Sequence, residues 1–379
     1  MKQLFITSVR DFETDTMGTV TAQEVPMPEP EADEIRIKVA YCSICGSDTH
    51  ILTGSLGELT EMTRSMLPMP FGHELSGVID KAGPKAEALG YYPGDKVVAN
   101  YARYCYSCDM CRSGRPNLCP NVQFCMNGMG EYACYHVTQI HKLPQDYDLL
   151  TSALIEPLTI ALGVAEQAKF SFGKSVAILG AGGIGLMLVQ LARLSGASAV
   201  TVFDLVEEKR ALALEMGADY AFDPREEGSV AKANACSGGP AYDCVIEGTG
   251  AMSAARLTLD LLAPDGNCVY YAMYGEHPYL DVNIHSQFYW DQKHLHGLKM
   301  GAGLFPKPSA WPPGWIWGSS FSGYTPSAGT NRPSRTSIPR STPRSSSRWT
   351  NSLSRVFGVT YVRKELGLTA KASQSNKLP

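Results

Sequence analysis

The first 150 residues carry short stretches in which apolar and polar positions alternate, and this pattern predicts a β-rich unit. In Glu34–Ala40 (EIRIKVA) apolar residues alternate with charged or polar ones, as in a strand with one buried face. Leu75–Asp80 and Lys96–Ala99 are short runs rich in β-branched residues, and Gly128–Val137 follows a glycine-rich turn. Glycine and proline punctuate this part densely, as a partly open barrel requires. We therefore expect a β-barrel domain over residues 1–157.

From about residue 157 the pattern changes, and short apolar runs begin to alternate with helical periods. The expected strands are Ser175–Leu179, Ala199–Phe203, Tyr242–Ile246 and Cys268–Ala272. The expected helices between them are Gly183–Leu194 and Glu207–Met216. Strands that alternate with helices are typical of a parallel, doubly wound sheet. The chain is therefore predicted to be an α/β protein, with a parallel-sheet domain over residues 158–297.

Residues 298–379 follow neither pattern. No Asp or Glu stands between Gln292 and Lys364, and the 51 residues from Phe305 to Arg355 include 13 Ser, 8 Pro and 6 Arg. Such a composition offers little apolar surface to bury. Two interpretations remain open for this segment. One is a shifted reading frame near residue 300, in the gene or in its sequencing, and the other is a genuine disordered tail rich in Ser, Pro and Arg.

Composition excludes several classes of partner. The net charge of −4, from 33 Lys and Arg against 37 Asp and Glu, gives no overall field that attracts nucleic acid or anionic membranes. No apolar run reaches the ~20 residues that span a bilayer. The N-terminal residues lack the apolar core of a secretory signal, so we expect a cytoplasmic protein. The eleven cysteines are then reduced thiols and metal ligands.

Four cysteines form the most specific motif of the chain. They stand within 15 residues, at Cys105, Cys108, Cys111 and Cys119, in a lobe at about residues 100–121. Four thiolates close a tetrahedral shell around zinc and leave no position for a substrate, so this motif predicts a structural zinc site. Free buried cysteines and an iron–sulfur site are the alternatives.

A second group of candidate metal ligands is dispersed along the chain. It consists of Cys45, His73, Glu74 and Glu156, with Asp48 close to the first of them. A thiolate, an imidazole and two carboxylates suffice for an open catalytic zinc site, and Asp48 would orient the imidazole. The alternative for Glu156 is a purely structural role before Pro157, at the boundary between the domains.

The third motif is GAGGIG, which follows the expected strand SVAIL and opens a helix. Its residues are Gly180, Ala181, Gly182, Gly183, Ile184 and Gly185. In this context the glycines permit a tight turn, a close approach of the pyrophosphate and packing of the helix on the strand. Asp204 ends the next expected strand, where a carboxylate binds ribose hydroxyls and repels a 2′-phosphate. Leu205 and Val206 follow rather than Arg, so NAD is preferred over NADP; the alternative is a glycine-rich turn without a cofactor.

Together these motifs identify a resemblance that covers residues 1 to about 297. GDKV at 94–97, GHE at 72–74, the four-cysteine lobe and GAGGIG resemble the medium-chain, zinc-dependent alcohol and polyol dehydrogenases. The resemblance implies a GroES-like barrel catalytic domain, a Rossmann domain and an active site in the cleft between them. It also implies a homodimer or homotetramer, and a small alcohol or polyol as the substrate.

The same resemblance implies roles for single residues. Cys45 and His73 are zinc ligands, with Glu74 and Glu156 as alternating or water-bridged carboxylate ligands. Simple alcohol dehydrogenases have Cys where this chain has Glu156, so the chain looks more like the sorbitol and butanediol dehydrogenase branch. The residues expected to contact NAD include Ile184, Asp204 and Lys209, and those expected to relay the proton are Ser47 and His50.

We therefore expect a zinc-dependent oxidoreductase with one catalytic and one structural zinc, which transfers a hydride from a secondary alcohol or polyol to NAD. Zinc lowers the pKa of the bound hydroxyl, and the hydride then passes to the nicotinamide. Two alternatives remain open. One is a threonine-type amino-alcohol dehydrogenase, which shares every motif above, and the other is a relative that binds NAD and zinc without turnover.

Overall fold

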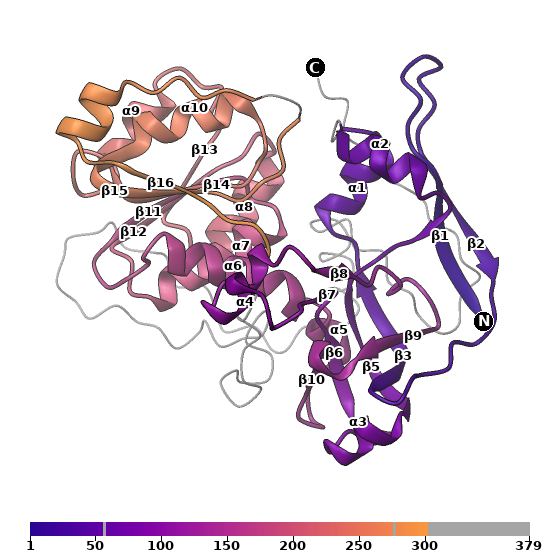
Figure 1. The fold of residues 1–379 in the computed structure, drawn as a ribbon. Coiled ribbons are helices and arrows are strands. Elements are labelled where there is room, and N and C mark those ends of the chain that lie inside the picture. Colours follow the sequence, from indigo (N-terminus) through magenta and orange to yellow (C-terminus); the bar gives the residue numbers. More distant parts are fainter. Residues whose placement is uncertain (56–57, 276–277, 302–379) are drawn as a thin grey trace, which may run out of the picture.

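The computed structural model describes residues 1–55, 58–275 and 278–301 of the chain. These residues form two units that lie side by side (Figure 1). We call the elements β1 to α5 the barrel unit and the elements α6 to β16 the parallel-sheet unit. Both interpretations of the C-terminal segment concern residues that, from 302 onward, lie outside the described part.

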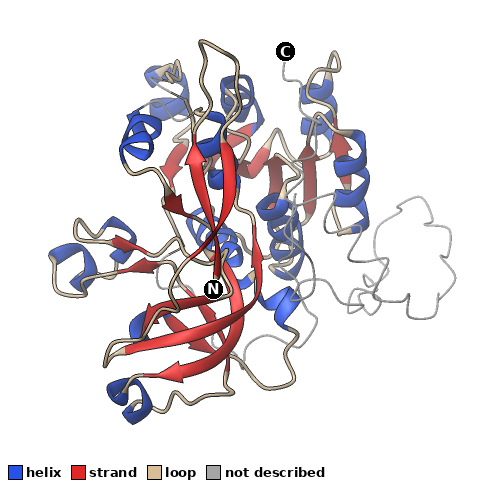
Figure 2. Ribbon diagram, turned by 90° about the vertical axis from the view of Figure 1, so that its right-hand side faces the viewer, coloured by secondary structure: helices blue, strands red, loops and turns tan. Residues whose placement is uncertain are grey.

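The barrel unit is built on antiparallel strands, several of them long and curved (Figure 2). Its main sheet has the order β10-β6-β5-β3-β9, with a smaller sheet β2-β1-β4 and a pair β7-β8. The strands are β1 (Lys2–Ser8), β2 (Thr19–Glu24), β3 (Glu34–Ser43), β4 (Met69–Pro70), β5 (Glu74–Ala82), β6 (Lys96–Ala99), β7 (Ala102–Arg103), β8 (Gln123–Phe124), β9 (Tyr132–His136) and β10 (Ile140–Lys142). Alternate residues of the sheet, among them Ile35, Ile37, Leu75 and Ile79, are at most 2% exposed and form its core.

Short helices connect these strands. They are α1 (Gly46–Thr53), α2 (Glu58–Ser65), α3 (Pro84–Ala88), α4 (Asp109–Arg112) and α5 (Leu149–Ser152), with 3-10 turns at Pro116–Leu118 and Val137–Gln139. Helix α1 begins after Cys45, whose backbone N–H donates to the Asp48 carboxylate over 3.0 Å. It ends at Gly54, whose positive φ of 66° favours glycine. The start of α1 thereby fixes two candidate site residues next to each other.

The parallel-sheet unit has six parallel strands in the order β13-β12-β11-β14-β15-β16. The strands are β11 (Ser175–Leu179), β12 (Ala199–Phe203), β13 (Tyr220–Phe222), β14 (Tyr242–Glu247), β15 (Leu262–Tyr270) and β16 (His294–Gly297). The helices are α6 (Ile155–Gln167), α7 (Gly183–Leu194), α8 (Glu207–Glu215), α9 (Ser229–Ala235) and α10 (Met252–Leu261), and a π-helical turn spans Ile284–Trp290. The strand order reverses between β11 and β14, and ligands of such sheets bind at this point.

Helices cover both faces of the parallel sheet (Figure 1). Helices α6, α7 and α8 contribute to one buried apolar cluster, whereas α9 and α10 contribute to another on the opposite face. Strands β11 and β12 are buried along their whole length, because both of their faces are covered. This explains their continuous apolar sequences.

The α/β class with a barrel and a doubly wound sheet is confirmed. The expected strands at 175–179 and 199–203 and the expected helix at 183–194 coincide with β11, β12 and α7. The strand expected at 268–272 differs, because β15 begins at Leu262 and ends at Tyr270. Among the described residues no helix combines the length and apolar character that a membrane span requires.

Candidate active site

Three side chains with metal-binding atoms meet within the barrel unit. Ligand atoms of Cys45, His73 and Glu74 all lie within 4.8 Å of one another. Antiparallel pairing of β3 with β5 sets Ser43 opposite Glu74, so the residues that follow β3 and precede β5 become neighbours. His73 and Glu74 are each 4% exposed. A thiolate, an imidazole and a carboxylate are ligands that zinc accepts, and three of them leave one position open for a substrate.

Asp48 lies behind the imidazole of His73. Its Oδ1 is 3.7 Å from Nδ1 of His73, and its Oδ2 accepts the N–H of Cys45. Asp48 is fully buried, and neither its Oδ1 nor Nδ1 of His73 has a hydrogen-bond partner among the described residues. Buried polar atoms are almost always satisfied, so these two atoms fit an imidazole that turns toward the carboxylate when its other nitrogen binds a metal.

Glu156 lies close to this group, but its carboxylate is not within 4.8 Å of all three ligand atoms. It stands in the first turn of α6 and is 5% exposed. Burial, together with the nearby carboxylates of Glu74 and Asp48, raises its pKa well above the usual range. The structure thus brings together three of the four expected ligands and places the fourth near enough to feel their charge.

The main electrostatic feature of the site is a group of buried acidic side chains. Burial, Glu74 and Asp48 also raise the pKa of the Cys45 thiol well above its ordinary value. Burial raises the pKa of Asp48 to about 6, with His73 opposing and Glu74 reinforcing the shift. Acidic groups gathered in a low-dielectric interior repel one another unless a cation is present. The donor set and its charge therefore fit a divalent zinc ion.

Two further side chains contact the site that sequence reasoning missed. The hydroxyl of Ser43 donates to the Glu74 carboxylate. The ring of Tyr101 lies 4.7 Å from that of His73 and stacks on Phe124 at 5.7 Å. Burial, Glu156 and Cys45 raise the pKa of the Tyr101 phenol, which stays a hydrogen-bond donor. The β3–β5 register could have indicated Ser43, whereas no sequence signal marks Tyr101.

The two expected proton-relay residues both lie on α1. Ser47 is half-buried, and its hydrogen bonds to the Cys45 thiol partly offset the increase of the Cys45 pKa. His50 is half-buried, its pKa is lowered by burial, and its Nδ1 lies 2.7 Å from the Ser55 hydroxyl. No hydrogen bond joins Ser47 to His50 within the described residues.

The four-cysteine lobe brings its thiols into one cluster. Their ligand atoms lie within 4.8 Å of one another, and all four are free thiols. The Sγ–Sγ distances are 3.5 Å for Cys105–Cys119, 3.9 Å for Cys108–Cys119 and 4.0 Å for Cys105–Cys111. Zn–S bonds of ~2.3 Å arranged as a tetrahedron separate sulfurs by about 3.8 Å. The lobe therefore fits a zinc ion bound by four thiolates.

Local hydrogen bonds stabilise the thiolate form of Cys105. The hydroxyl and backbone N–H of Ser107 lower the pKa of Cys105 to about 5, which favours its thiolate. The backbone N–H of Cys108 contributes a contact of 3.4 Å to the Cys105 sulfur. The lobe also contacts the parallel-sheet unit, since Asn117 Nδ2 donates to the carbonyl oxygen of Lys299 over 3.1 Å.

The glycine-rich turn between β11 and α7 has the shape of a phosphate cradle. Gly180 has a φ of 104°, which favours glycine, and a Cβ on Gly185 would lie 1.9 Å from the Gly180 carbonyl oxygen. A Cβ on Gly182 would meet nothing within 4 Å, so the turn borders open space there. Gly183 begins α7, and Ile184 packs against the core beneath the turn. The free N–H groups of the helix start suit a pyrophosphate.

Asp204 follows β12 beside this turn. Its carboxylate accepts the backbone N–H of Ala181 over 2.8 Å and that of Val206 over 2.9 Å. Lys209 is half-buried on α8 and makes no hydrogen bond or ion pair with the described residues. Arg210, which sequence reasoning did not select, donates from Nη1 to the Asp204 carbonyl oxygen over 2.8 Å. The structure therefore joins Asp204 to the glycine-rich turn but leaves Lys209 apart.

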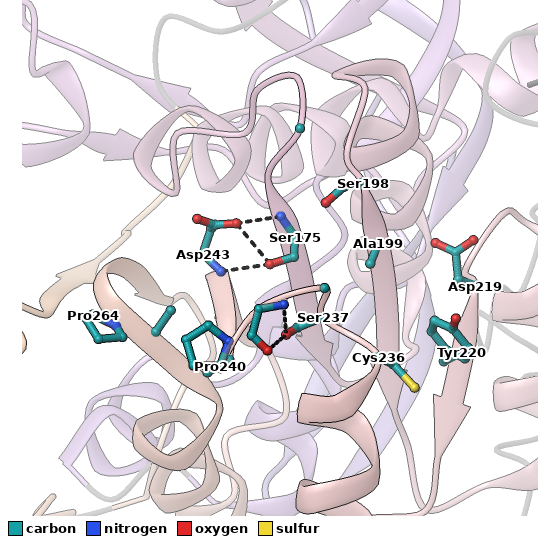
Figure 3. Close-up of a pocket in the computed structure, with 15 residues that line it drawn as sticks. Ser175, Ser198, Ala199, Asp219, Tyr220, Cys236, Ser237, Pro240, Asp243 and Pro264 are labelled. Carbon is teal, nitrogen blue, oxygen red and sulfur yellow. Dashed lines mark hydrogen bonds between the residues drawn. The ribbon is translucent and has the colours of Figure 1, made fainter. Parts of the chain in front are cut away.

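A cavity of 640 Å³ lies at the opposite, amino-terminal edge of the parallel sheet (Figure 3). Ser175, Ala199 and Tyr220, which begin β11, β12 and β13, line it, together with the segment 236–241. The Asp243 carboxylate accepts hydrogen bonds from Ser175 and Lys174, so its charge is already neutralised. The cavity contains none of the expected site residues.

Comparison with known proteins adds the family context. The family model "Alcohol dehydrogenase GroES-like domain" matches residues 31–145, and the model "Zinc-binding dehydrogenase" matches residues 183–313. The 2-dehydro-3-deoxy-L-galactonate 5-dehydrogenase of Pseudoalteromonas atlantica is 30% identical over 275 residues, covering 72% of this chain and 77% of that protein. Sorbitol dehydrogenase of Bombyx mori is 34% identical over 215 residues, covering 55% of this chain and 60% of that protein.

A solved structure is also similar to this chain in sequence and fold. The crystal structure of a zinc-binding dehydrogenase from Clostridium scindens is 64% identical in sequence and superimposes with a TM-score of 0.80. The match covers 81% of this chain and 88% of that one.

Proposed function

The chain belongs to the zinc-dependent medium-chain alcohol and polyol dehydrogenase family, and within that family we propose that it oxidises a secondary hydroxyl of a vicinal diol or polyol with NAD. The observation that carries this proposal is the buried group of Cys45, His73 and Glu74, with a further carboxylate, Glu156, beside it. This donor set suits a zinc ion that keeps one position open for a substrate oxygen.

In this proposal Cys45, His73 and Glu74 hold the catalytic zinc, and Asp48 orients the His73 ring from behind. When bound, zinc supplies a Lewis acid that lowers the pKa of the substrate hydroxyl. Glu156 serves as an alternating or water-bridged carboxylate at the same centre. The Ser43 hydroxyl fixes the Glu74 carboxylate by its hydrogen bond.

The proton of the substrate hydroxyl leaves through α1. Ser47 lies beside Cys45 and receives the proton first, and His50 passes it to solvent. Burial lowers the pKa of His50, so its imidazole is neutral near pH 7 and can accept a proton. The ring of Tyr101 packs against His73, and Phe124 stacks on Tyr101.

The parallel-sheet unit binds NAD at the reversal of its strand order. The N–H groups at the start of α7, around Gly182 and Gly183, hold the pyrophosphate. Asp204 accepts hydrogen bonds from the ribose hydroxyls, which replace the N–H groups that it accepts in this structure. Ile184 supports the turn from below, and Lys209 flanks the adenosine end.

Two features support an oxygen-rich substrate. Glu156 provides a carboxylate, which is a harder ligand than a thiolate. Carboxylates suit metal centres that coordinate several oxygens. The phenol of Tyr101 is a protonated donor next to His73 and can bind a second substrate hydroxyl. A vicinal diol has a second hydroxyl that the Tyr101 phenol can bind, whereas a mono-alcohol has none.

We also propose that the four-cysteine lobe binds a structural zinc and that the chain acts as a homodimer or homotetramer in the cytoplasm. All eleven cysteines are free thiols, as a reducing compartment requires. Ile284, Tyr289 and Trp290 are each 66–69% exposed and offer an apolar contact area. Light scattering of the purified chain tests the oligomeric state.

A substrate panel tests the proposed function. The zinc-loaded chain should form NADH with sorbitol or 2,3-butanediol far faster than with ethanol or propanol. Turnover of threonine alone would favour an amino-alcohol dehydrogenase. Binding of NAD without turnover of any compound in the panel would indicate a non-catalytic relative.

A further inference from the structure

Two carboxylates stand at neighbouring positions of the edge at which the adenosine ribose is proposed to bind. Asp204 follows β12 and Asp223 follows β13, and the Asp204 N–H donates to the carbonyl oxygen of Phe222 over 3.2 Å. The Asp204 carboxylate is already shared between the N–H groups of Ala181 and Val206. Its negative charge is therefore partly compensated by backbone dipoles.

Asp223 holds two guanidinium groups against the Asp204–Leu205 backbone. Arg225 donates from Nε to Asp223 Oδ1 over 3.0 Å, and from Nη2 to Asp223 Oδ2 over 2.6 Å. The same Nη2 lies 3.2 Å from the Leu205 carbonyl oxygen. Arg210 Nη1 lies 2.8 Å from the Asp204 carbonyl oxygen and 3.4 Å from Asp223 Oδ2. Both cations are thus fixed against the backbone of the loop that carries the proposed ribose acceptor.

The charge of this edge differs from what the sequence alone suggests. The segment after Asp204 contains Leu205 and Val206, so a bare carboxylate is expected to repel a 2′-phosphate. In the fold the guanidinium groups of Arg210 and Arg225 both pair with Asp223 and contact the Asp204–Leu205 backbone. Arg225, which lies 20 residues beyond Leu205, supplies the positive charge that Leu205 and Val206 lack.

Arg225 is also free to bind a further anion. Its side chain is 67% exposed, and its Nη1 makes no hydrogen bond with any described residue. Hydrogen bonds that Arg225 donates lower the pKa of Asp223 to about 2, so this anchoring carboxylate stays charged in the neutral range. A guanidinium that is held in place and keeps unused N–H donors is well suited to a phosphate.

We propose that Arg225, anchored by Asp223, is a cofactor-specificity residue that binds the 2′-phosphate of NADP, so that the chain accepts NADP as a second hydride acceptor beside NAD. The inference rests on the proposed function, which places the adenosine ribose at Asp204. Asp204 retains its charge, and NAD therefore remains the better cofactor. Arg210 is less exposed and supports the loop from the other side.

Binding of adenosine phosphates to the full chain tests this inference without any need for turnover. Isothermal titration compares 5′-AMP with adenosine 2′,5′-bisphosphate (2′,5′-ADP), which differ only in the phosphate on the 2′ oxygen. The expected dissociation constants lie within about 100-fold of each other. In Arg225→Gln the affinity for 2′,5′-ADP should fall about tenfold or more, while that for 5′-AMP changes less than about twofold.

Two further variants keep the comparison matched. Arg225→Lys retains the charge and should lose less affinity for 2′,5′-ADP than Arg225→Gln. Arg256→Gln removes an exposed arginine on α10, on the other side of β11, and should change neither affinity. Equal losses for both ligands in Arg225→Gln would contradict the inference, because a merely structural role has that effect.

The outcomes separate the inference from the proposed function. A chain that binds 5′-AMP but fails to bind 2′,5′-ADP within the 100-fold range overturns the role of Arg225 and leaves the NAD site intact. A chain that binds neither ligand contradicts the proposed cofactor site itself, and with it the inference.

Discussion

Oδ1 of Asp48 lies 3.7 Å from Nδ1 of His73, and both atoms are buried without a hydrogen-bond partner in the described part of the chain. The carboxylate is held in place through its other oxygen by the N–H of Cys45. Asp48 thus contacts Cys45, which precedes α1, and faces the imidazole of His73, which precedes β5. This relationship connects the local structure of α1 to the proposed metal centre.

Asp48→Asn tests the orienting role of this carboxylate. The variant keeps the shape of the side chain but loses its charge, so the affinity of the catalytic site for zinc should fall about 10- to 100-fold. Competition with a chromogenic chelator measures this affinity, and the lobe zinc should stay bound. Asp80→Asn, on the barrel surface where Asp80 pairs with Arg36, is the matched control and should retain both zinc ions.

The pH dependence of the metal-free chain gives a second prediction. The Asp48 pKa of about 6 in the folded state lies above its ordinary value of 3.8, so folding favours the protonated form. This contribution to the free energy of unfolding is complete below pH 3.8 and is lost as the pH rises to about 6, by about 3 kcal/mol. After chelation, Asp48→Asn should therefore be more stable than the parent chain at pH 7 and similar to it near pH 4. Urea unfolding at both pH values measures the difference, and an equal difference at the two would refute it.

Two cysteine variants should separate the metal sites. Cys45→Ser removes a ligand of the open site, so turnover should be abolished while one zinc per chain stays in the lobe. Cys108→Ser opens the closed thiolate shell, and the melting temperature should fall by about 5 °C or more. Metal analysis and calorimetry measure both effects. Loss of both zinc ions in Cys45→Ser would show that the sites are not independent.

Asp204→Ala tests the ribose acceptor. The variant lacks the carboxylate that binds the ribose hydroxyls, so the KM for NAD should rise about tenfold or more. It also lacks the charge that opposes a 2′-phosphate, and the preference for NAD over NADP should shrink. Steady-state kinetics with both cofactors measures these changes. An unmutated chain that prefers NADP would contradict the assignment of Asp204.

Sequence patterns were sufficient where the chemistry is local. The GAGGIG turn has its strand and helix directly beside it, and β11, α7 and β12 coincide with the expected ranges. The spacing of the lobe cysteines likewise requires only a short loop, and the four thiols do meet.

Residues that act through tertiary contacts had no local signal. Tyr101 reaches His73 from the loop after β6, and Arg225 reaches the Leu205 carbonyl from beyond the neighbouring strand β13. Ser43 requires the register of β3 on β5. The short strand β16 (HLHG) was also not predicted. Its own sequence has no strand pattern, and its parallel pairing with β15 stabilises it.

Glu156 separates a polyol site from a simple alcohol site. In Glu156→Cys a softer thiolate replaces the carboxylate, so the catalytic zinc should leave more slowly under mild chelation. Selectivity should also move toward mono-alcohols. Stopped-flow release of zinc and a substrate panel measure the two changes. Unchanged zinc content and turnover in Glu156→Ala would mean that the residue has only a structural role at the start of α6.

The central claim is most directly tested with 2,3-butanediol and 2-butanol, which differ by one hydroxyl. NADH formation by the zinc-loaded chain gives kcat/KM for each alcohol, with Cys45→Ser as the inactive control. We expect a kcat/KM at least about tenfold higher for the diol, which corresponds to one additional hydrogen bond in the transition state. An equal or higher kcat/KM for 2-butanol would contradict it.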